Sequence, residues 1–183
     1  MRPDPALEEM KRVADGRIAD RRARGETGRA PDLLDLLLRA EGPGDQDFSG
    51  PDVRDNLMAF IVAGHETTAL TLAWALYLMG FDETVQERAR AEARGVLGDR
   101  VAGAGDVERL PFIRAVLDET LRLYPPAAFL SRTAREMDEL CGARILPGDT
   151  VSVPIWAVHR HQRLWDRPDA FDPSRFKRGP PVD

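Results

Sequence analysis

The sequence predicts a mainly α-helical fold with a small β-hairpin region. Two features predict it: a long segment, 52–79, that is apolar on most sides, and a change after Pro126 to short apolar runs separated by turn residues. The chain has 183 residues, 43% hydrophobic and 31% charged, which is enough for one domain with a core. We expect a single domain over 1–183 that is helical over 1–126, with a hairpin, a short helix and ordered coil over 127–183.

The first helices are expected on either side of a glycine-containing break. Residues 6–24 place apolar side chains at near-helical spacing among charges, which predicts an amphipathic surface helix. The segment 25–30 breaks it, and Pro31-Asp32 opens a short buried helix over 33–38. The glycine-rich and acidic segment 41–50 is typical of a mobile loop.

One long helix is expected from Asp52 to Met79. At 1.5 Å per residue it spans roughly 40 Å, and its apolar second half predicts a path through the centre of the protein. The uncharged stretch 67–81 is 15 residues long, shorter than the roughly 20 that a membrane-spanning helix needs. A buried core helix is therefore the better interpretation.

Two more helices and a loop are expected before Pro126. Asp82 is suited to cap a helix with a charged outer face, the segment 103–106 is expected to be a loop, and residues 112–124 form a helix that Pro125-Pro126 stops.

The remaining chain is expected to contain strands. Residues 129–134 suit one strand, and 143–146 and 150–154 flank the turn Pro147-Gly148-Asp149, which indicates a hairpin. Residues 158–165 suit a short helix, and the proline-, aspartate- and arginine-rich chain from Arg167 onward suits ordered coil.

Charge and cysteine content restrict the setting. The net charge of −5 and pI of about 5.3 argue against non-specific binding to nucleic acid or anionic membranes. A single cysteine, Cys141, excludes an intrachain disulfide and fits a reducing cytoplasm. Met1 to Pro5 are followed by no apolar run, so we expect no signal peptide and a cytoplasmic protein.

The middle of the long helix is an unusual place for its residues. Gly64 and the β-branched Thr67 weaken a helix, and Glu66 is a costly charge beside an apolar stretch. The residues alone allow a helix kink with an exposed Glu66, or a polar site that something flat can approach. A zinc-protease site is excluded, because the motif needs a second histidine where this chain has Ala69.

Three further residues suggest an ion cluster. Glu119 and Arg122 share one helix face at i, i+3, and Arg175 lies between aromatics in a proline-containing coil, from where it could reach Glu119. The alternatives are an ordinary surface ion pair and a solvated arginine.

The order of these motifs resembles the cytochrome P-450 superfamily of heme-thiolate monooxygenases. Ala-Gly-His-Glu-Thr-Thr lies in a long helix, followed by Glu-x-x-Arg before Pro-Pro, a hairpin, His159-Arg160 and Trp165, and then Phe-x-Pro-x-Arg-Phe over 171–176. The resemblance implies a partial cytochrome P-450 fold around the long central helix, heme as cofactor, a small organic substrate, and a ferredoxin or reductase as redox partner.

The resemblance also implies roles for single residues. Ala63 and Gly64 match positions that make room for heme and dioxygen, Thr67 the hydroxyl that holds oxygen, and Glu66 the acid that relays protons. Arg132 matches an arginine that pairs with a heme propionate, and 126–130 would line the substrate pocket. The buried ion cluster of the family would be formed by Glu119, Arg122 and Arg175.

One departure from the family is large. The cysteine that ligates iron lies in a glycine-rich loop just after Phe-x-Pro-x-Arg-Phe, whereas this chain ends at 179–183, before that loop, and Cys141 has the wrong context. We expect a monooxygenase piece that is inactive alone and has no metal ligand of its own. The alternative is a non-catalytic helical binding module or decayed gene product, in which His65, His159 and His161 could bind heme or metal weakly.

Overall fold

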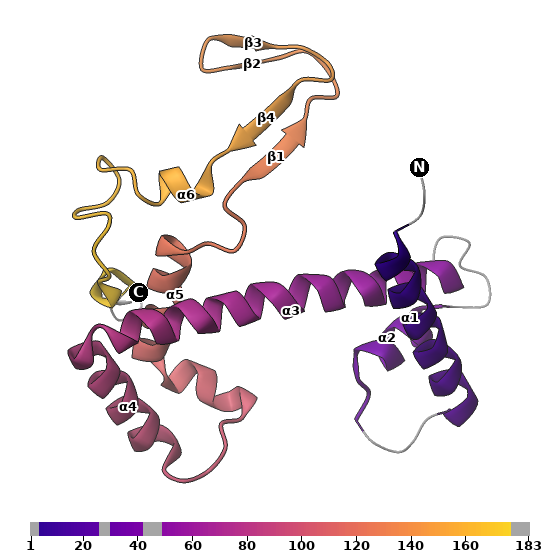
Figure 1. Cartoon of the computed structure of the whole chain (residues 1–183), viewed down its shortest axis with the longest axis horizontal. Coiled ribbons are helices and arrows are strands. Elements are labelled where there is room, and N and C mark those ends of the chain that lie inside the picture. Colours follow the sequence, from indigo (N-terminus) through magenta and orange to yellow (C-terminus); the bar gives the residue numbers. More distant parts are fainter. Residues whose placement is uncertain (1–3, 26–29, 42–48, 177–183) are drawn as a thin grey trace, which may run out of the picture. The chain divides into compact units, whose positions relative to one another are not determined.

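The computed structural model describes residues 4–25, 30–41 and 49–176 (Figure 1). The expected start at 1–3, most of the helix break at 25–30, the centre of the 41–50 loop and the final coil from 177 lie outside the described residues. The chain forms two compact units, residues 1–66 and 67–183. Helix α3 (Gly50–Gly80) runs through the point where one unit ends and the other begins.

The first unit is built from α1 (Pro5–Arg24), α2 (Leu33–Ala40) and the start of α3. The side chain of Asp4 caps α1, and Asp32 and Asp35 form a reciprocal capping box at the start of α2. Ile18, Leu34 and Val53 form the core of this unit. The prediction that α2 is buried is wrong except for Leu34, because α2 presents only one side to this core and leaves Leu33 and Leu36 exposed.

An arginine ties α1 to α2. Arg21 Nη1 donates to Asp32 Oδ1 at 2.8 Å and to Asp35 Oδ1 at 2.5 Å. The pKa of Asp35 is lowered, mainly by the hydrogen bond from the backbone N–H of Asp32 and next by the hydrogen bond from the Arg21 side chain.

The second unit contains the rest of α3, then α4 (Glu83–Leu97), the 3₁₀ helix η1 (Ala104–Arg109) and α5 (Pro111–Leu123). The predicted cap at Asp82 is confirmed, since its side chain accepts from Val85 N at 3.0 Å. Ala89 of α4 packs with Phe112 and Val116 of α5 to form the core of this unit.

Residues 103–106, expected to be a loop, largely belong to η1. The prediction is wrong because Asp106 organises this segment: its carboxylate accepts from Gly103 N at 2.9 Å and from Arg100 at 2.6 and 2.7 Å. Asp106 is buried, and these hydrogen bonds hold its pKa well below the ordinary value. The bond from Arg100 is the largest cause of the lowered pKa.

The strands pair differently from the prediction. The expected hairpin partners, β3 (Ala143–Ile145) and β4 (Thr150–Val153), do not pair with each other. Instead β4 pairs antiparallel with β1 (Leu130–Thr133), and β3 pairs with β2 (Asp138–Leu140), which was not expected to be a strand.

Two turns explain this pairing. Cys141 and Gly142 have φ values of 52° and 80°, so they form a two-residue turn that joins β2 directly to β3. The Pro147-Gly148-Asp149 turn is hydrogen-bonded to the end of β1 instead of joining β3 to β4 as a hairpin. Gly148 N donates to Ala134 O, just beyond β1, at 2.9 Å. The β2–β3 hairpin is therefore an excursion between β1 and β4, as the ribbon in Figure 1 shows.

The last helix is also shifted. The helix α6 covers Ile155–Val158 instead of the predicted 158–165, and the described part of the chain ends with a second 3₁₀ helix, η2 (Pro173–Phe176). The carbonyl of His159, the residue that follows the helix, accepts from the side chain of Arg122 at 2.8 Å. The chain beyond continues in turns, with Trp165 Nε1 donating to Val158 O at 3.2 Å.

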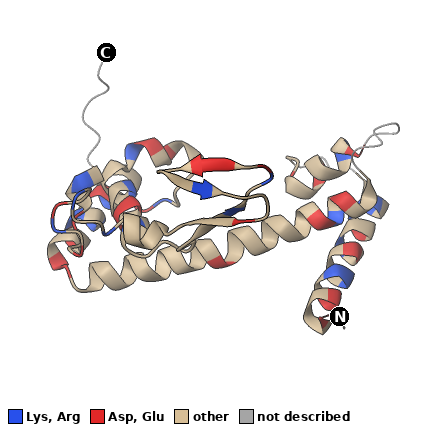
Figure 2. Ribbon diagram, turned by 90° about the horizontal axis from the view of Figure 1, so that it is seen from above, with Lys and Arg blue, Asp and Glu red and all other residues tan. Residues whose placement is uncertain are grey.

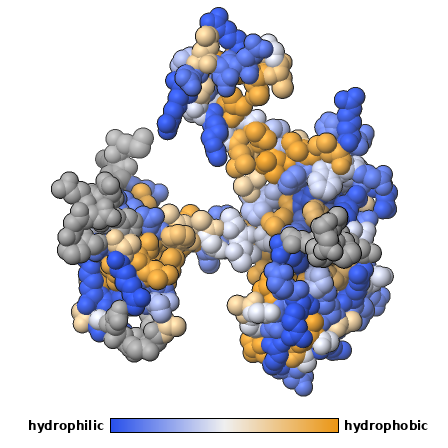
Figure 3. Space-filling view, turned by 180° about the vertical axis from the view of Figure 1, so that it is seen from behind, coloured by the Kyte–Doolittle hydropathy of each residue, from blue (hydrophilic) through white to orange (hydrophobic). Residues whose placement is uncertain are grey.

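Most of α3 is exposed, which contradicts its expected path through a core. Val53 and Ala75 are its buried residues, and residues 59–70 are all exposed. Figure 2 shows that this helix carries little charge: between Asn56 and Gly80, Glu66 is the only Asp, Glu, Lys or Arg. Exposed apolar side chains (orange) are visible on the surface in Figure 3.

By length and composition, α3 is one helix of the described chain that could cross a membrane. Its most apolar 18-residue window has a mean hydropathy of 1.2. The core helix of a soluble protein meets the same criterion, so this finding is weak evidence for a membrane segment.

Candidate distal heme face and buried ion cluster

The segment of α3 that the motif analysis singled out is continuous, exposed helix. Ala63, Gly64, Glu66 and Thr67 all lie at its surface. The carboxylate of Glu66 makes no ion pair or hydrogen bond with the residues that the structure describes. A Cβ added at Gly64 would meet nothing within 4 Å, so the small residues here leave open space beside the backbone.

An apolar cavity of about 400 Å³ begins at Thr67. Its wall combines threonines of α3 with leucines of α5 and the chain just after α5, and it is lined by Thr67, Thr68, Thr71, Leu72, Leu117, Leu121, Pro126 and Ala127. Of the segment expected to line a substrate pocket, Pro126 and Ala127 therefore take part. Leu117 and Leu121 were missed, although their i, i+4 spacing on α5 was the available signal.

Arg132 lies on β1, outside this cavity. Its Nη1 donates to the carbonyl of Ser131 at 2.9 Å, and it lines a separate cavity of about 350 Å³ beside the β2–β3 hairpin. Among the described residues it forms no hydrogen bond or ion pair with a member of either candidate site.

Glu119, Arg122 and Arg175 do lie together, and they are not at the surface. Glu119 is 0% exposed and Arg122 is 2% exposed. The two groups bind bidentately, with Arg122 Nε to Glu119 Oε2 at 2.7 Å and Nη2 to Oε1 at 2.8 Å. Arg175 Nε approaches Glu119 Oε1 at 3.3 Å, from 56 residues further along the chain.

Backbone groups complete the coordination of both charges. Arg122 also donates to the carbonyls of His159, Pro168 and Ala170, at 2.8, 2.6 and 3.1 Å. Asp172 N donates to Glu119 at 2.8 Å. Every N–H of the Arg122 guanidinium can thus be used, which is what allows the charge to be buried.

His159 forms a reciprocal link with the same arginine. Its ring Nδ1 lies 3.2 Å from the carbonyl oxygen of Arg122, while its own carbonyl accepts from the Arg122 side chain. His159 belongs to a motif visible in the sequence, but this link was not predictable, because a carbonyl partner carries no residue-type signal.

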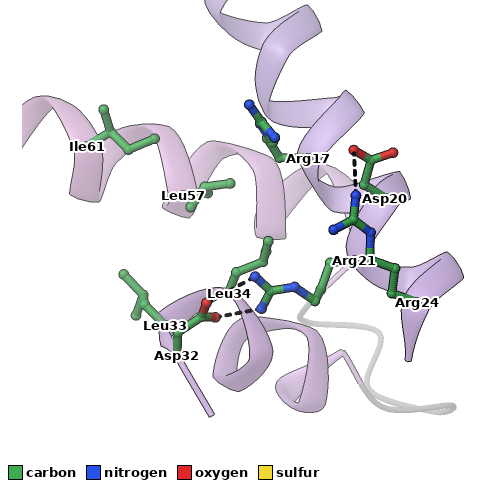
Figure 4. Close-up of a pocket in the computed structure, with 9 residues that line it drawn as sticks. All are labelled: Arg17, Asp20, Arg21, Arg24, Asp32, Leu33, Leu34, Leu57 and Ile61. Carbon is green, nitrogen blue, oxygen red and sulfur yellow. Dashed lines mark hydrogen bonds and ion pairs between the residues drawn. The ribbon is translucent and has the colours of Figure 1, made fainter. Parts of the chain in front are cut away.

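The first unit has a cavity of its own, of about 440 Å³, which contains none of the predicted site residues. Figure 4 shows its apolar wall of Leu33, Leu34, Leu57 and Ile61 facing arginines of α1. The Arg21 guanidinium in this cavity is already engaged by Asp32.

The residues present fit one face of a heme group and supply no ligand for its iron there. Small side chains, open space at Gly64 and an apolar wall suit a flat porphyrin. None of the residues that line the cavity at Thr67 is a cysteine or histidine. Cys141 is exposed at the turn of the β2–β3 hairpin, and the described residues contain no group of three or more His, Cys, Asp or Glu that could hold a metal.

Fold and site together define a mainly helical protein with an apolar cavity at Thr67 and a buried Glu-Arg-Arg cluster. Comparison with known sequences agrees: the family described as Cytochrome P450 matches residues 4–180. The chain is 35% identical to cyclooctatin synthase of Streptomyces melanosporofaciens over 173 residues, covering 94% of this chain and 38% of the relative. It is 37% identical to a putative cytochrome P450 132 of Mycobacterium tuberculosis, covering 96% and 39% respectively.

Solved structures give the same result. A zebra fish cytochrome P450 solved with progesterone superposes with a TM-score of 0.82 at 31% identity, covering 93% of this chain and 42% of that one. The chain therefore belongs to the cytochrome P450 family, whose cofactor is heme. It spans about two fifths of the length of these relatives.

Proposed function

We propose that this chain carries the distal, oxygen-side part of a heme-dependent monooxygenase that inserts one oxygen atom from O₂ into an organic substrate. The observation that carries the proposal is the Ala63–Thr67 segment, with two small residues, one carboxylate and one hydroxyl. It lies in a stretch of α3, residues 57–79, that has no other Asp, Glu, Lys or Arg, and its Thr67 lines an apolar cavity. Family membership supports the class of cofactor and reaction.

Each residue of this segment has a task in the proposal. When bound, heme supplies the redox chemistry by which O₂ is reduced and cleaved. Glu66 takes up protons from solvent, to which its exposed carboxyl has access, and Thr67 Oγ1 passes a proton on because a hydroxyl both accepts and donates. Ala63 and Gly64 leave room for the ring.

The remaining predicted residues serve binding and architecture. The leucines of the cavity wall exclude water and receive the apolar part of a substrate. Arg132 pairs with a heme propionate, and Glu119, Arg122 and Arg175 hold α5 against the chain that follows it. The complete protein takes electrons from a ferredoxin or reductase and is cytoplasmic.

A chimera tests the catalytic roles. Residues 4–180 replace the matching segment of cyclooctatin synthase, and product and hydrogen peroxide are measured per reductant consumed, on that enzyme's own substrate. We expect Glu66→Gln and Thr67→Val each to lower product formation by about 100-fold, the lower range for a positioned proton donor. The comparison variant Thr68→Val removes a neighbouring hydroxyl of the same cavity wall and should lower product formation much less than Thr67→Val. If Thr67→Val and Thr68→Val behave alike, the assignment is wrong.

We further propose that the 183-residue chain alone is inactive, because its one cysteine, Cys141, is exposed, whereas a heme-thiolate ligand is buried. The test is the absorbance of the chain mixed with heme and reduced by dithionite under carbon monoxide. We expect no Soret band at the thiolate position, and the same spectrum for Cys141→Ser. A thiolate-type band that Cys141→Ser abolishes would overturn this proposal.

A further inference from the structure

A cavity in the second unit is not used by any role assigned above. It has a volume of about 700 Å³ and follows directly after α6, in the turns that replace the expected helix. It is lined by Trp156, Ala157, Arg160, His161, Gln162, Arg163 and Asp169. Two arginines and a histidine face one carboxylate, so the lining carries an excess of positive charge.

Arg160 is a largely buried arginine whose charge is poorly matched. Its side chain is 15% exposed, and among the described residues its Nη1, which is enclosed, has no hydrogen-bond partner. Its one ion-pair partner among the described residues, Asp169, lies 3.5 Å from Nε and is itself 85% exposed.

Arg122, in the same unit, shows what a satisfied buried arginine needs. It makes five hydrogen bonds, two to Glu119 and three to backbone carbonyls. A buried charge without such acceptors costs free energy, because it has lost water and gained nothing equivalent.

Aromatic rings hold the Arg160 guanidinium in place. Its Cζ lies 4.4 Å from the ring centroid of Trp156 and 5.6 Å from that of Tyr124. Stacking of this kind orients the planar fork but provides no oxygen acceptor. The group is positioned in the cavity wall and still lacks a strong acceptor.

We propose that this cavity binds an oxyanion, either a phosphate or a carboxylate, with Arg160 as its principal contact. Because Nη1 is enclosed, the Nε and Nη2 edge of the guanidinium meets the anion, and this edge matches both groups bidentately. Arg163 contributes a second positive charge to the lining. Asp169, exposed and at 3.5 Å, is displaced toward solvent when the anion enters.

The test is titration of the ¹⁵N-labelled 183-residue chain with inorganic phosphate and, separately, with acetate, followed by ¹H–¹⁵N NMR at constant ionic strength. We expect saturable shifts confined to residues 156–169. The anion that binds more tightly identifies the source, a phosphorylated or a carboxylate ligand. Removing the charged bonds of Arg160 in Arg160→Gln raises the dissociation constant about tenfold or more.

Two further variants keep the result decisive. Arg167→Gln removes an equal charge nearby, from a residue outside the lining, and leaves the dissociation constant unchanged. Arg163→Gln weakens binding measurably and stands in for Arg160→Gln if that variant fails to fold. Shifts that do not saturate and that chloride reproduces would overturn the proposal. So would dissociation constants for Arg160→Gln and Arg163→Gln that equal that of the parent.

Discussion

Glu119 and Glu87 begin two Glu-x-x-Arg pairs of identical spacing, and we predict very different stability effects when each becomes glutamine. Glu119 is 0% exposed and accepts two hydrogen bonds from Arg122 and one from Asp172 N. In Glu119→Gln the Arg122 charge stays buried without a counter-ion, which costs about 3–5 kcal/mol of the free energy of unfolding. Glu87 pairs with Arg90 on α4 with its side chain 59% exposed, so Glu87→Gln costs about 0–1 kcal/mol.

The assay is urea unfolding of the 183-residue chain at neutral pH, followed by circular dichroism at 222 nm. A third variant, Arg175→Gln, guards against complete loss of folding in Glu119→Gln. It removes the longer 3.3 Å contact and lowers the free energy of unfolding by about 1.5 kcal/mol. If Glu119→Gln falls within about 1 kcal/mol of Glu87→Gln, burial does not govern the value of these pairs and the reasoning is refuted.

Three other changes give independent checks in the same unfolding assay. Glu92 accepts from the first backbone N–H groups of α5, Phe112 N at 2.9 Å and Ile113 N at 2.8 Å, so Glu92→Ala should lower the free energy of unfolding by about 1–2 kcal/mol; an unchanged midpoint argues against this cap. Gly95 lies inside α4 with open space around it, so Gly95→Ala should raise stability by about 0.5–1 kcal/mol, and a loss contradicts the helix assignment. Because the pKa of Asp106 is lowered below its ordinary value of 3.8, its stabilising contribution is complete above that pH and is lost as pH falls further. Asp106→Asn should therefore be less stable than the parent at pH 7, with the difference shrinking below about pH 4; a difference that persists in acid excludes the ionised carboxylate as the cause.

The helices were predictable because their signals are local. Apolar periodicity and capping residues such as Asp32 and Asp82 describe a helix without reference to the rest of the chain. The strand pairing was not predictable in this way. Pro-Gly-Asp suits a hairpin turn as well as Cys141-Gly142 does, and a cysteine at positive φ carries no sequence signal.

Burial was the second point at which sequence and structure differ. Periodicity shows that α3 is apolar on most sides, but it does not show which element, if any, covers each side. In the candidate sites, the sequence pattern marked the charged members Glu119, Arg122 and Arg175. The oxygen atoms that complete the arginine's coordination belong to the backbone of residues 159–170, where any residue type could supply them.

The coordination of Arg122 also has a consequence for the order in which the second unit can form. Its partners lie 37, 46 and 48 residues further along the chain, and the N–H that Asp172 donates to Glu119 lies 53 residues away. Helix α5 can form from local hydrogen bonds. Its charged face cannot be buried until those later residues have been synthesised and have closed a long loop. A nascent chain that has reached only the β strands therefore exposes an unfinished α5, and completion of this unit on the ribosome depends on the segment from 159 to 175.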